Sequence, residues 1–311
     1  MEGAWSGSVP SVLTRDRAGF GAMSAEECRR GALRSLGMSA QDGLFVVGPS
    51  APSPRPRSAA LRYPGSKWSW ATTITSYFGP HYHYVEPYFG SGAVFFTKEV
   101  SPHELINDTN HLVVNFFKVL RDRTDDLQFA LEATPWSREE YDHSHVLIGD
   151  ELEDARRFVV RIWQAHASDL AKKTGWKNRG SKQRARGMSQ RWLRVPGELA
   201  ELAHRLKDAE IECRPAVDLM RRFATTDTLI YADPPYLPET RTQMMYAYEM
   251  TTDDHVEMLD VLRQHPGPVV LSGYENALYD KQLPSWRKVM VKPPKVEAGA
   301  SRMEVLWVKG A

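Results

Sequence analysis

The chain has 311 residues, enough for one large domain or two smaller ones with a sizeable core. Its 42% apolar and 25% charged residues are typical of a globular protein, and no apolar run reaches the roughly 18 residues of a membrane-spanning helix. No secretory signal is visible, and Cys28 and Cys213 form no metal-binding or redox spacing. We therefore expect a cytoplasmic protein without a bound metal and without a membrane partner.

Positive charge is concentrated in one part of the chain. From Arg156 to Arg194 there are twelve Lys or Arg and one acid, Asp169, a net charge of +11. Because the whole chain carries +1, the remainder carries −10. A segment with such an excess is suited to binding a polyanion.

Residues 1–60 differ in composition from the rest. They are rich in Gly, Ser, Ala and Pro, and four prolines between Pro49 and Pro56 suit an extended linker. A short helix from Ser24 to Leu36, with Ser24 as its cap, is the regular element that the pattern suggests. We expect this extension to be disordered or a linker outside the main fold.

The first expected element of the main fold is a tight loop from Leu61 to Lys67, leading into a helix from Trp68 to Tyr77. A glycine close to a lysine at a helix start can receive an anion, because the free amides and the dipole end point the same way. The upstream glycine of a nucleotide phosphate loop is missing. A plain surface turn is the alternative interpretation.

A strand from Tyr82 to Val85 is followed by a glycine-rich turn, Glu86 to Gly92, and by a predicted helix from Ala93 to Lys98. Strand, glycine turn and helix form the first half of a dinucleotide-type binding unit, in which glycines let a ligand approach the backbone. The three-glycine phosphate fingerprint is incomplete. This favours a ligand without a pyrophosphate.

The next strand, Glu104 to Ile106, ends in Asn107 and Asp108. Asp108 follows Gly90 by 18 residues, close to the roughly 20-residue offset at which such folds place an acid on ribose hydroxyls. The two features together predict a nucleoside-bearing cofactor. An amphipathic helix is expected from His111 to Leu120.

From residue 124 to 206 the pattern is helical and contains the basic segment. Its loop, Thr174 to Lys182, is cationic and rich in glycine, and Trp176 and Trp192 interrupt the charge. Basic side chains neutralise phosphates, while a tryptophan can stack on bases or wedge between them. The alternative is a solvated basic face with tryptophans in the core.

The stretch from Thr228 to Tyr236 contains an apolar strand that stops at two prolines. Leu229 to Tyr231 have strand character, and Pro234 and Pro235 cannot continue a ladder. One carboxylate and one tyrosine are thus expected at the carboxyl end of a strand, where ligands bind in open α/β sheets. By itself, the stretch could equally be a turn.

Further elements follow on both sides of this stretch. Strands are expected at Glu210 to Cys213 and Val269 to Leu271, and an antiparallel edge hairpin at Lys288 to Lys292 and Met303 to Val308. Leu237 to Glu249 is predicted to be a mobile loop over the site. His255, in the next helix, is a candidate catalytic base but is expected to be structural. Alternating strands and helices predict an α/β fold with a mainly parallel sheet covered by helices on both faces.

Four motifs, in this order, resemble those of the Dam-like, D12 class of adenine-specific DNA methyltransferases. Tyr63 to Lys67 is similar to its amino-terminal cofactor motif, Glu86 to Gly92 to its glycine motif, and Asn107-Asp108 to its ribose motif. Asp233 to Tyr236 is similar to its catalytic tetrapeptide. The resemblance implies a Rossmann-like S-adenosylmethionine-dependent methyltransferase sheet with an inserted, mainly helical target-recognition domain.

The resemblance also implies domain bounds and partners. Residues 61–123 and 207–311 would form the catalytic domain and residues 124–206 the basic target-recognition domain. The cofactor would be S-adenosyl-L-methionine and the partner double-stranded DNA, whose target base is flipped out. We expect a monomer of bacterial or phage origin; the sequence indicates neither its recognition site nor whether a cognate restriction enzyme exists.

Residue roles are carried over position by position. The residues expected at the cofactor are Tyr63, Lys67, Glu86, Phe89, Gly90, Gly92, Asp108 and Asp233. The catalytic residues would be Asp233, Pro234, Pro235 and Tyr236. The residues expected to bind DNA are Arg62, Lys172, Lys173, Trp176, Lys177, Arg179, Lys182, Arg184 and Arg186. The chain departs from the family pattern at Ser66, where glycine is common, and at Pro215, where many relatives carry an acid.

The expected chemistry follows from the target amine, whose lone pair is delocalised into the adenine ring. The Asp233 carboxylate and the Pro234 carbonyl would accept its hydrogen bonds and stabilise the charge that develops during attack. Tyr236 would stack on the extruded base. The alternatives are N4 methylation of cytosine, methylation of RNA, and a silent DNA-binding protein on the same scaffold; Asp233 favours adenine, because serine commonly opens the cytosine motif.

Overall fold

The protein is described by a computed structural model that covers residues 59–166, 170, 172–178, 182–241, 245–291 and 303–310, with the backbone alone for 182–189. The helix expected at Ser24–Leu36 and nearly all of the amino-terminal extension lie outside these residues. Residues 52–311 form one compact unit. Of the helices described, none combines the length and apolar character needed to cross a membrane.

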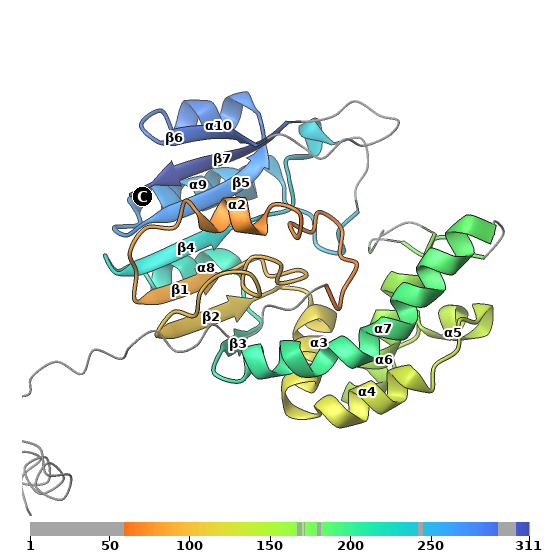
Figure 1. Cartoon of the computed structure of the whole chain (residues 1–311). Coiled ribbons are helices and arrows are strands. Elements are labelled where there is room, and N and C mark those ends of the chain that lie inside the picture. Colours follow the sequence, from red (N-terminus) through yellow and green to blue (C-terminus); the bar gives the residue numbers. More distant parts are fainter. Residues whose placement is uncertain are drawn as a thin grey trace, which may run out of the picture. The chain divides into compact units, whose positions relative to one another are not determined.

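The centre of the molecule is a twisted sheet (Figure 1). Its described strands are β1 (His83–Glu86), β2 (His103–Asn107), β3 (Glu210–Glu212), β4 (Thr228–Ala232), β5 (Val269–Tyr274), β6 (Arg287–Val291) and β7 (Glu304–Lys309). They are ordered β3-β2-β1-β4-β5-β7-β6. Neighbours from β3 to β5 pair in parallel, while β7 runs antiparallel to both β5 and β6.

Alternation along β4 shows why the sheet needs helices on both faces. Leu229 and Tyr231 belong to one buried cluster, and Ile230 and Ala232 to another. The second cluster is covered by α8 (Ala216–Arg222), α9 (Thr252–Gln264) and α10 (Ala277–Gln282). The first is covered by α2 (Ala71–Thr75) and α3 (His111–Asp122). The predicted α/β class, with a mainly parallel sheet between helices, is confirmed.

Two predicted helices differ from those observed. Residues 93–98 form hydrogen-bonded turns rather than a helix, and Val94, Phe95 and Phe96 are all buried. The backbone hydrogen bonds have mixed spacings, three residues from Thr97 to Val94 and four from Phe96 to Gly92, so they do not continue as a regular helix. The helix expected from Trp68 to Tyr77 is reduced to α2, because the chain before it turns to bring Lys67 into the interior.

The carboxyl-terminal hairpin also differs from a simple edge ribbon. Its two strands pair antiparallel, as predicted, but β7 lies between β5 and β6, so that β6 forms the edge at this end of the sheet. Strand β7 is buried along most of its length, whereas β6 is largely exposed. The start of β7 is thereby brought next to the end of β5, beside the strand that carries Asp233.

The segment from 124 to 206 is helical, as expected. It contains α4 (Thr124–Glu132), α5 (Arg138–His143), α6 (Glu151–Gln164) and α7 (Lys182–Leu206), which lie together beside the sheet (Figure 1). Their apolar faces continue the core of α3. Because the core is shared, the division into a catalytic and a target-recognition domain stays a prediction about function.

Candidate active site

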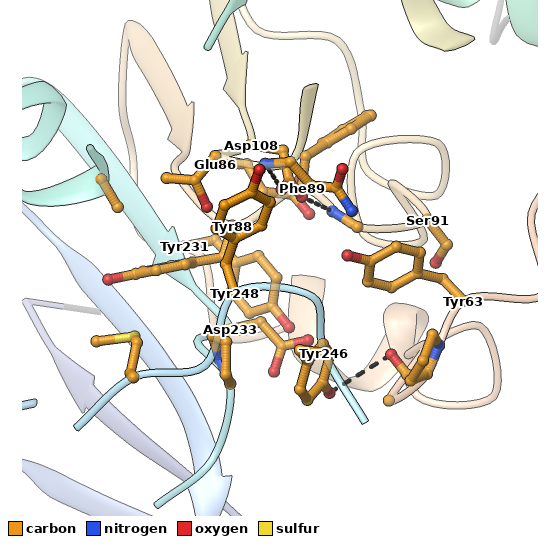
Figure 2. Close-up of a pocket in the computed structure, with 18 of the residues that line it drawn as sticks. Tyr63, Glu86, Tyr88, Phe89, Ser91, Asp108, Tyr231, Asp233, Tyr246 and Tyr248 are labelled. Carbon is orange, nitrogen blue, oxygen red and sulfur yellow. Dashed lines mark hydrogen bonds between the residues drawn. The ribbon is translucent and has the colours of Figure 1, made fainter. Parts of the chain in front are cut away.

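A cavity of about 350 Å³ opens at the carboxyl ends of β1, β2 and β4. The chain runs from β1 to β2 on one side and returns to β4 on the other, so the strand order reverses at this point. Ligands of doubly wound sheets bind at such a reversal. Figure 2 shows Tyr63, Tyr88, Tyr246 and Tyr248 around the cavity, with Asp108 and Asp233 among them.

Asp233 follows β4 and lines the cavity. Its Oδ2 lies 3.0 Å from the ammonium Nζ of Lys67. Its Oδ1 accepts a hydrogen bond of 2.8 Å from the hydroxyl of Ser272 on the neighbouring strand β5. Since Pro234 follows immediately and fixes the backbone, the carboxylate is held from two sides in one orientation.

Lys67 is buried, with 4% of its surface exposed, yet its side chain lines the cavity. Besides Asp233 it contacts the Gly65 carbonyl at 2.7 Å and lies 3.9 Å from Glu304. Burial alone disfavours the ammonium, but Asp233 and Glu304 outweigh it and raise the pKa of Lys67. The lysine was expected near the cofactor; its described contacts are to Asp233, the Gly65 carbonyl and Glu304.

Tyr236 does not line the cavity and is 6% exposed. Its hydroxyl donates a 3.0 Å hydrogen bond to Glu304, and its ring packs edge-on against Tyr274, with centroids 4.6 Å apart. The Lys67 ammonium lies 4.9 Å from the ring centroid. Of the two prolines, Pro235 lines the cavity and Pro234 does not. Base stacking by Tyr236 stays a prediction.

Asp108 follows β2, as the sequence predicted, and lines the same cavity. Its carboxylate accepts hydrogen bonds from the backbone amides of Gly90 at 2.9 Å and Asn110 at 2.8 Å. Burial raises the pKa of Asp108 to about 6, although these two bonds oppose the shift. In the part of the chain that the structure describes, the carboxylate has no cationic partner.

The two glycines of the glycine motif have different roles. Gly90 lines the cavity with φ of 50°, a conformation that favours glycine, and a Cβ there would come 3.0 Å from the Tyr63 ring. Gly92 does not line the cavity. A Cβ at Gly92 would lie 2.5 Å from the ring of Phe89, so Gly92 shapes the packing behind the cavity rather than its surface.

Glu86, at the end of β1, is a third carboxyl group of the cavity. It accepts a 2.6 Å hydrogen bond from the Tyr84 hydroxyl. Burial raises the pKa of Glu86 to about 8. At neutral pH the group is therefore mainly protonated, which suits a hydrogen-bond donor better than an anion.

The loop after Tyr236 covers the cavity, as predicted, through Tyr246, Tyr248, Glu249 and Met250. The Tyr246 hydroxyl points to the Pro64 carbonyl at 3.5 Å (Figure 2). Glu249 accepts hydrogen bonds from the amides of residues 245 and 246 at 2.9 and 3.0 Å and pairs with Arg241. The loop is thus held by its own half-buried ion pair.

The predicted DNA-binding residues are only partly described. The guanidinium of Arg62 lies 5.6 Å from the Trp163 ring centroid, and burial and the nearby Arg191 lower the pKa of Arg62. Lys172 and Lys173 are exposed, and Lys173 pairs with Asp142 at 2.7 Å. Arg179 lies outside the described residues, and Lys182, Arg184 and Arg186 are described by the backbone of α7 alone.

Trp176 and Trp192 of the basic segment make hydrogen bonds within the protein, and contact of Trp176 with DNA stays a prediction. Trp192 is 5% exposed and donates to the Thr134 carbonyl, so it is a core residue. Trp176 donates a 3.0 Å hydrogen bond to Gln164, and Arg138 lies 5.0 Å from its ring. Lys177 is half-buried, and its carbonyl accepts from the Trp136 indole. In this structure both Trp176 and Lys177 attach the loop to the helices.

Sequence reasoning missed Ser272 and Glu304 as parts of the site. Ser272 directly follows the predicted strand Val269 to Leu271, and its place at the carboxyl end of that strand could have indicated it. Glu304 lies 68 residues after Tyr236, in a hairpin for which the sequence signals no function. Separately, the described residues include no group of three or more His, Cys, Asp or Glu side chains placed to hold a metal ion.

Comparison of the sequence with known proteins and protein families points to the same family throughout. The sequence model of the D12 class N6 adenine-specific DNA methyltransferases matches residues 63–294. The chain is 24% identical over 258 residues to the DNA adenine methylase of Salmonella typhimurium, covering 79% of this chain and 92% of that protein. It is 24% identical over 211 residues to the DNA adenine methylase of Vibrio cholerae serotype O1, covering 65% and 75%.

Among solved structures, a SAM dependent methyltransferase from Agrobacterium tumefaciens is similar at 11% identity and a TM-score of 0.34. The match covers 77% of this chain and 60% of that one. At this TM-score the likeness supports no conclusion about the fold, which is instead given by the strand order.

Proposed function

The chain belongs to the D12 class N6 adenine-specific DNA methyltransferases. We propose that the Asp233 carboxylate accepts a hydrogen bond from the amino group of the target adenine. The family transfers a methyl group from S-adenosyl-L-methionine to N6 of adenine in DNA. The observation that carries the proposal is the position of Asp233, which is fixed by Lys67 and Ser272 at the carboxyl end of β4 inside the cavity.

The cavity fits the cofactor in size and chemistry. Its volume of about 350 Å³ lies in the range of small-molecule sites. Among the described residues, the hydrogen-bond partners of the Asp108 carboxylate are two backbone amides, and the carboxylate would hold the ribose hydroxyls. Phe89 and the segment Pro215 to Val217 would supply an apolar wall for the adenine ring. When bound, S-adenosyl-L-methionine supplies an electrophilic methyl group.

Asp233 can act on the amine while keeping its present partners. Each carboxylate oxygen accepts two hydrogen bonds, so Oδ1 and Oδ2 retain free acceptor sites beside Ser272 and Lys67. Together with the Pro234 carbonyl, the carboxylate would orient the amino hydrogens of a flipped adenine. Both acceptors would stabilise the positive charge that grows on the nitrogen during attack. The rigid Pro-Pro backbone keeps them in place without reorganisation.

Two further roles rest on the same site. We propose that Tyr236 forms the aromatic surface on which the extruded base stacks, which would offset the few kcal/mol lost on unstacking. Residues 124–206 would contact the duplex through the basic segment. The excess charge of this segment, together with the exposed Lys172 and Lys173, supports that role.

The activity is tested directly with purified protein, labelled S-adenosyl-L-methionine and DNA from cells that lack adenine methylation. Nucleoside analysis of the product should give N6-methyladenine. Label in N4-methylcytosine would exclude the assignment to adenine. Methyl transfer to RNA but not to DNA would exclude DNA as the substrate. Absence of methyl transfer would indicate a catalytically inactive DNA-binding protein with the same fold.

The DNA-binding role is tested by replacing Lys177, Arg179 and Lys182 together with glutamine. Binding should weaken, and the dependence of log K on log salt should flatten by about 0.9 for each phosphate that is no longer neutralised. A matched control is Arg263→Gln, since Arg263 is an exposed arginine of α9 that pairs with Asp260. A salt slope unchanged from the parent would contradict the assigned face.

We also propose that the protein acts as a monomer in the bacterial cytoplasm. The relatives named above are bacterial DNA methylases, which supports the compartment. Light scattering during size exclusion tests the monomer, and a mass near twice 35.3 kDa would overturn it.

A further inference from the structure

Glu304 stands at the meeting point of the catalytic groups, although it lies far from every motif in the sequence. Its Oε2 accepts a 3.0 Å hydrogen bond from the Tyr236 hydroxyl and lies 3.9 Å from the Lys67 ammonium. The side chain is 19% exposed. A carboxyl group that is largely removed from water is stable only when polar partners satisfy it, and these two are its described partners.

The sheet order is what brings Glu304 here. Strand β7 is inserted between β5 and β6, and its first residue, Glu304, pairs in register with Tyr274, the last residue of β5. The Tyr274 ring packs edge-on against Tyr236. The tyrosine of the tetrapeptide is therefore held at its hydroxyl by Glu304 and at its ring by the strand partner of Glu304.

The contacts leave the Tyr236 ring little freedom. Lys67 lies over the ring at 4.9 Å from its centroid and simultaneously contacts Asp233. Without the Glu304 carboxyl group, the Tyr236 hydroxyl would lose its described acceptor and Lys67 would lose its second carboxyl neighbour. Both the aromatic surface and the cation that orients Asp233 depend on the same carboxyl group.

We propose that Glu304 is a positioning residue of the active site, which fixes the ring of Tyr236 through its hydroxyl and keeps Lys67 beside Asp233. The inference rests on the proposed function, because it assumes that Tyr236 and Asp233 form the surface against which the target adenine reacts. Glu304 itself is not among the residues that line the cavity.

The hydrogen bond is tested without any methylation assay. Incorporation of 3-fluorotyrosine at position 236 gives a single fluorine resonance that reports on the phenol hydrogen bond. Glu304→Ala should shift this resonance, while Glu275→Ala should not, since Glu275 is an exposed glutamate that pairs with Lys288. A resonance unmoved by Glu304→Ala overturns the proposal, whatever the activity of the protein.

The consequence for catalysis is tested by single-turnover methylation of unmethylated genomic DNA. Glu304→Ala should lower the rate about ten- to a hundredfold, which corresponds to the loss of a hydrogen bond to a charged group. Glu304→Gln, whose amide oxygen still accepts from the hydroxyl, should be markedly faster than Glu304→Ala. S-adenosyl-L-methionine binding and the melting temperature are measured for each variant, and a rate loss explained by either overturns the positioning role.

A double-mutant cycle separates positioning from a general structural effect. In a Tyr236→Phe background the hydroxyl is absent, so Glu304→Ala should cause much less further loss than in the parent. Rate losses that multiply independently would overturn the part of the proposal in which Glu304 acts through the Tyr236 hydroxyl. If the parent methylates no adenine, the proposed function fails, while the fluorine resonance still decides whether Glu304 holds Tyr236.

Discussion

The ends of β2 and β4 each place one aspartate in the same cavity, but in different electrostatic surroundings. Asp233, after β4, is held by the Lys67 ammonium and the Ser272 hydroxyl. Asp108, after β2, is held by two backbone amides, and burial raises its pKa to about 6. One carboxylate is therefore held by a cation and a hydroxyl group, as the proposed role in methyl transfer requires, whereas the other has backbone partners, as the proposed role at the ribose hydroxyls requires.

This comparison predicts the largest effect at Asp233. Asp233→Ala should lower the rate of methyl transfer by about 10³-fold, the scale for removing a preorganised electrostatic contact to a reacting group. Because Asp108 is unchanged, binding of S-adenosyl-L-methionine, measured by calorimetry, should persist. If the variant methylates DNA at the parental rate, Asp233 has no role in the reaction, and the proposed difference in role between Asp233 and Asp108 is wrong.

A smaller loss is expected when the cation at the β4 end is removed. Lys67→Met leaves Asp233 and Glu304 without the ammonium between them, so the carboxylate loses its fixed orientation. The rate should fall by about 10²-fold, with cofactor affinity changed much less. Lys288→Met, which removes an exposed lysine paired with Glu275 and Asp280, is the matched control. If cofactor affinity falls as much as the rate, Lys67 serves the cofactor directly.

At the end of β2, the role of Asp108 should affect the affinity for S-adenosyl-L-methionine rather than the rate of methyl transfer. Since the pKa of Asp108 is raised to about 6, its anion is present above that pH and is lost as the pH falls through it. Affinity for S-adenosyl-L-methionine should therefore weaken by up to about tenfold from pH 6 to pH 5. In Asp108→Ala the affinity should be lower and nearly independent of pH. The same pH dependence in that variant would assign the titration to another group.

The smallest effect is expected at Glu86, the carboxyl group between the two. Its pKa is raised from 4.5 to about 8 by burial, so its contribution to folding is complete below about pH 4.5 and is lost as the pH rises through about 8. Glu86→Gln has no proton to lose, and it should melt a few degrees above the parent at pH 8.5 and close to it at pH 4.5. A gain of equal size at both values would show that Glu86 does not titrate in this way.

Much of the fold could be predicted from the sequence because its signals are local. Apolar runs ending in acids placed β1, β2 and β4, and the helical spacing from His111 to Leu120 gave α3 within a few residues. The turns at residues 93–98 were predicted wrongly, because the burial of Phe95 and Phe96 on all sides depends on tertiary contacts. Trp192 was weighed as a base-stacking residue but lies in the core, since a tryptophan among cations gives no local sign of which face it presents.

The sequence alone indicates that Asp108 and Asp233 reach the cavity, because each follows a strand whose direction in a parallel sheet is set by the alternating pattern. Glu249 and Asp254 also line the cavity, and only the tertiary fold brings them there. The partners of these groups depend on the tertiary fold. Lys67 meets Asp233 because a turn brings it inward, and Glu304 meets Tyr236 because β7 pairs between β5 and β6. The physical reason is that periodicity and chain direction are local properties, whereas an ion pair or a hydrogen bond between distant segments depends on how the whole sheet is ordered.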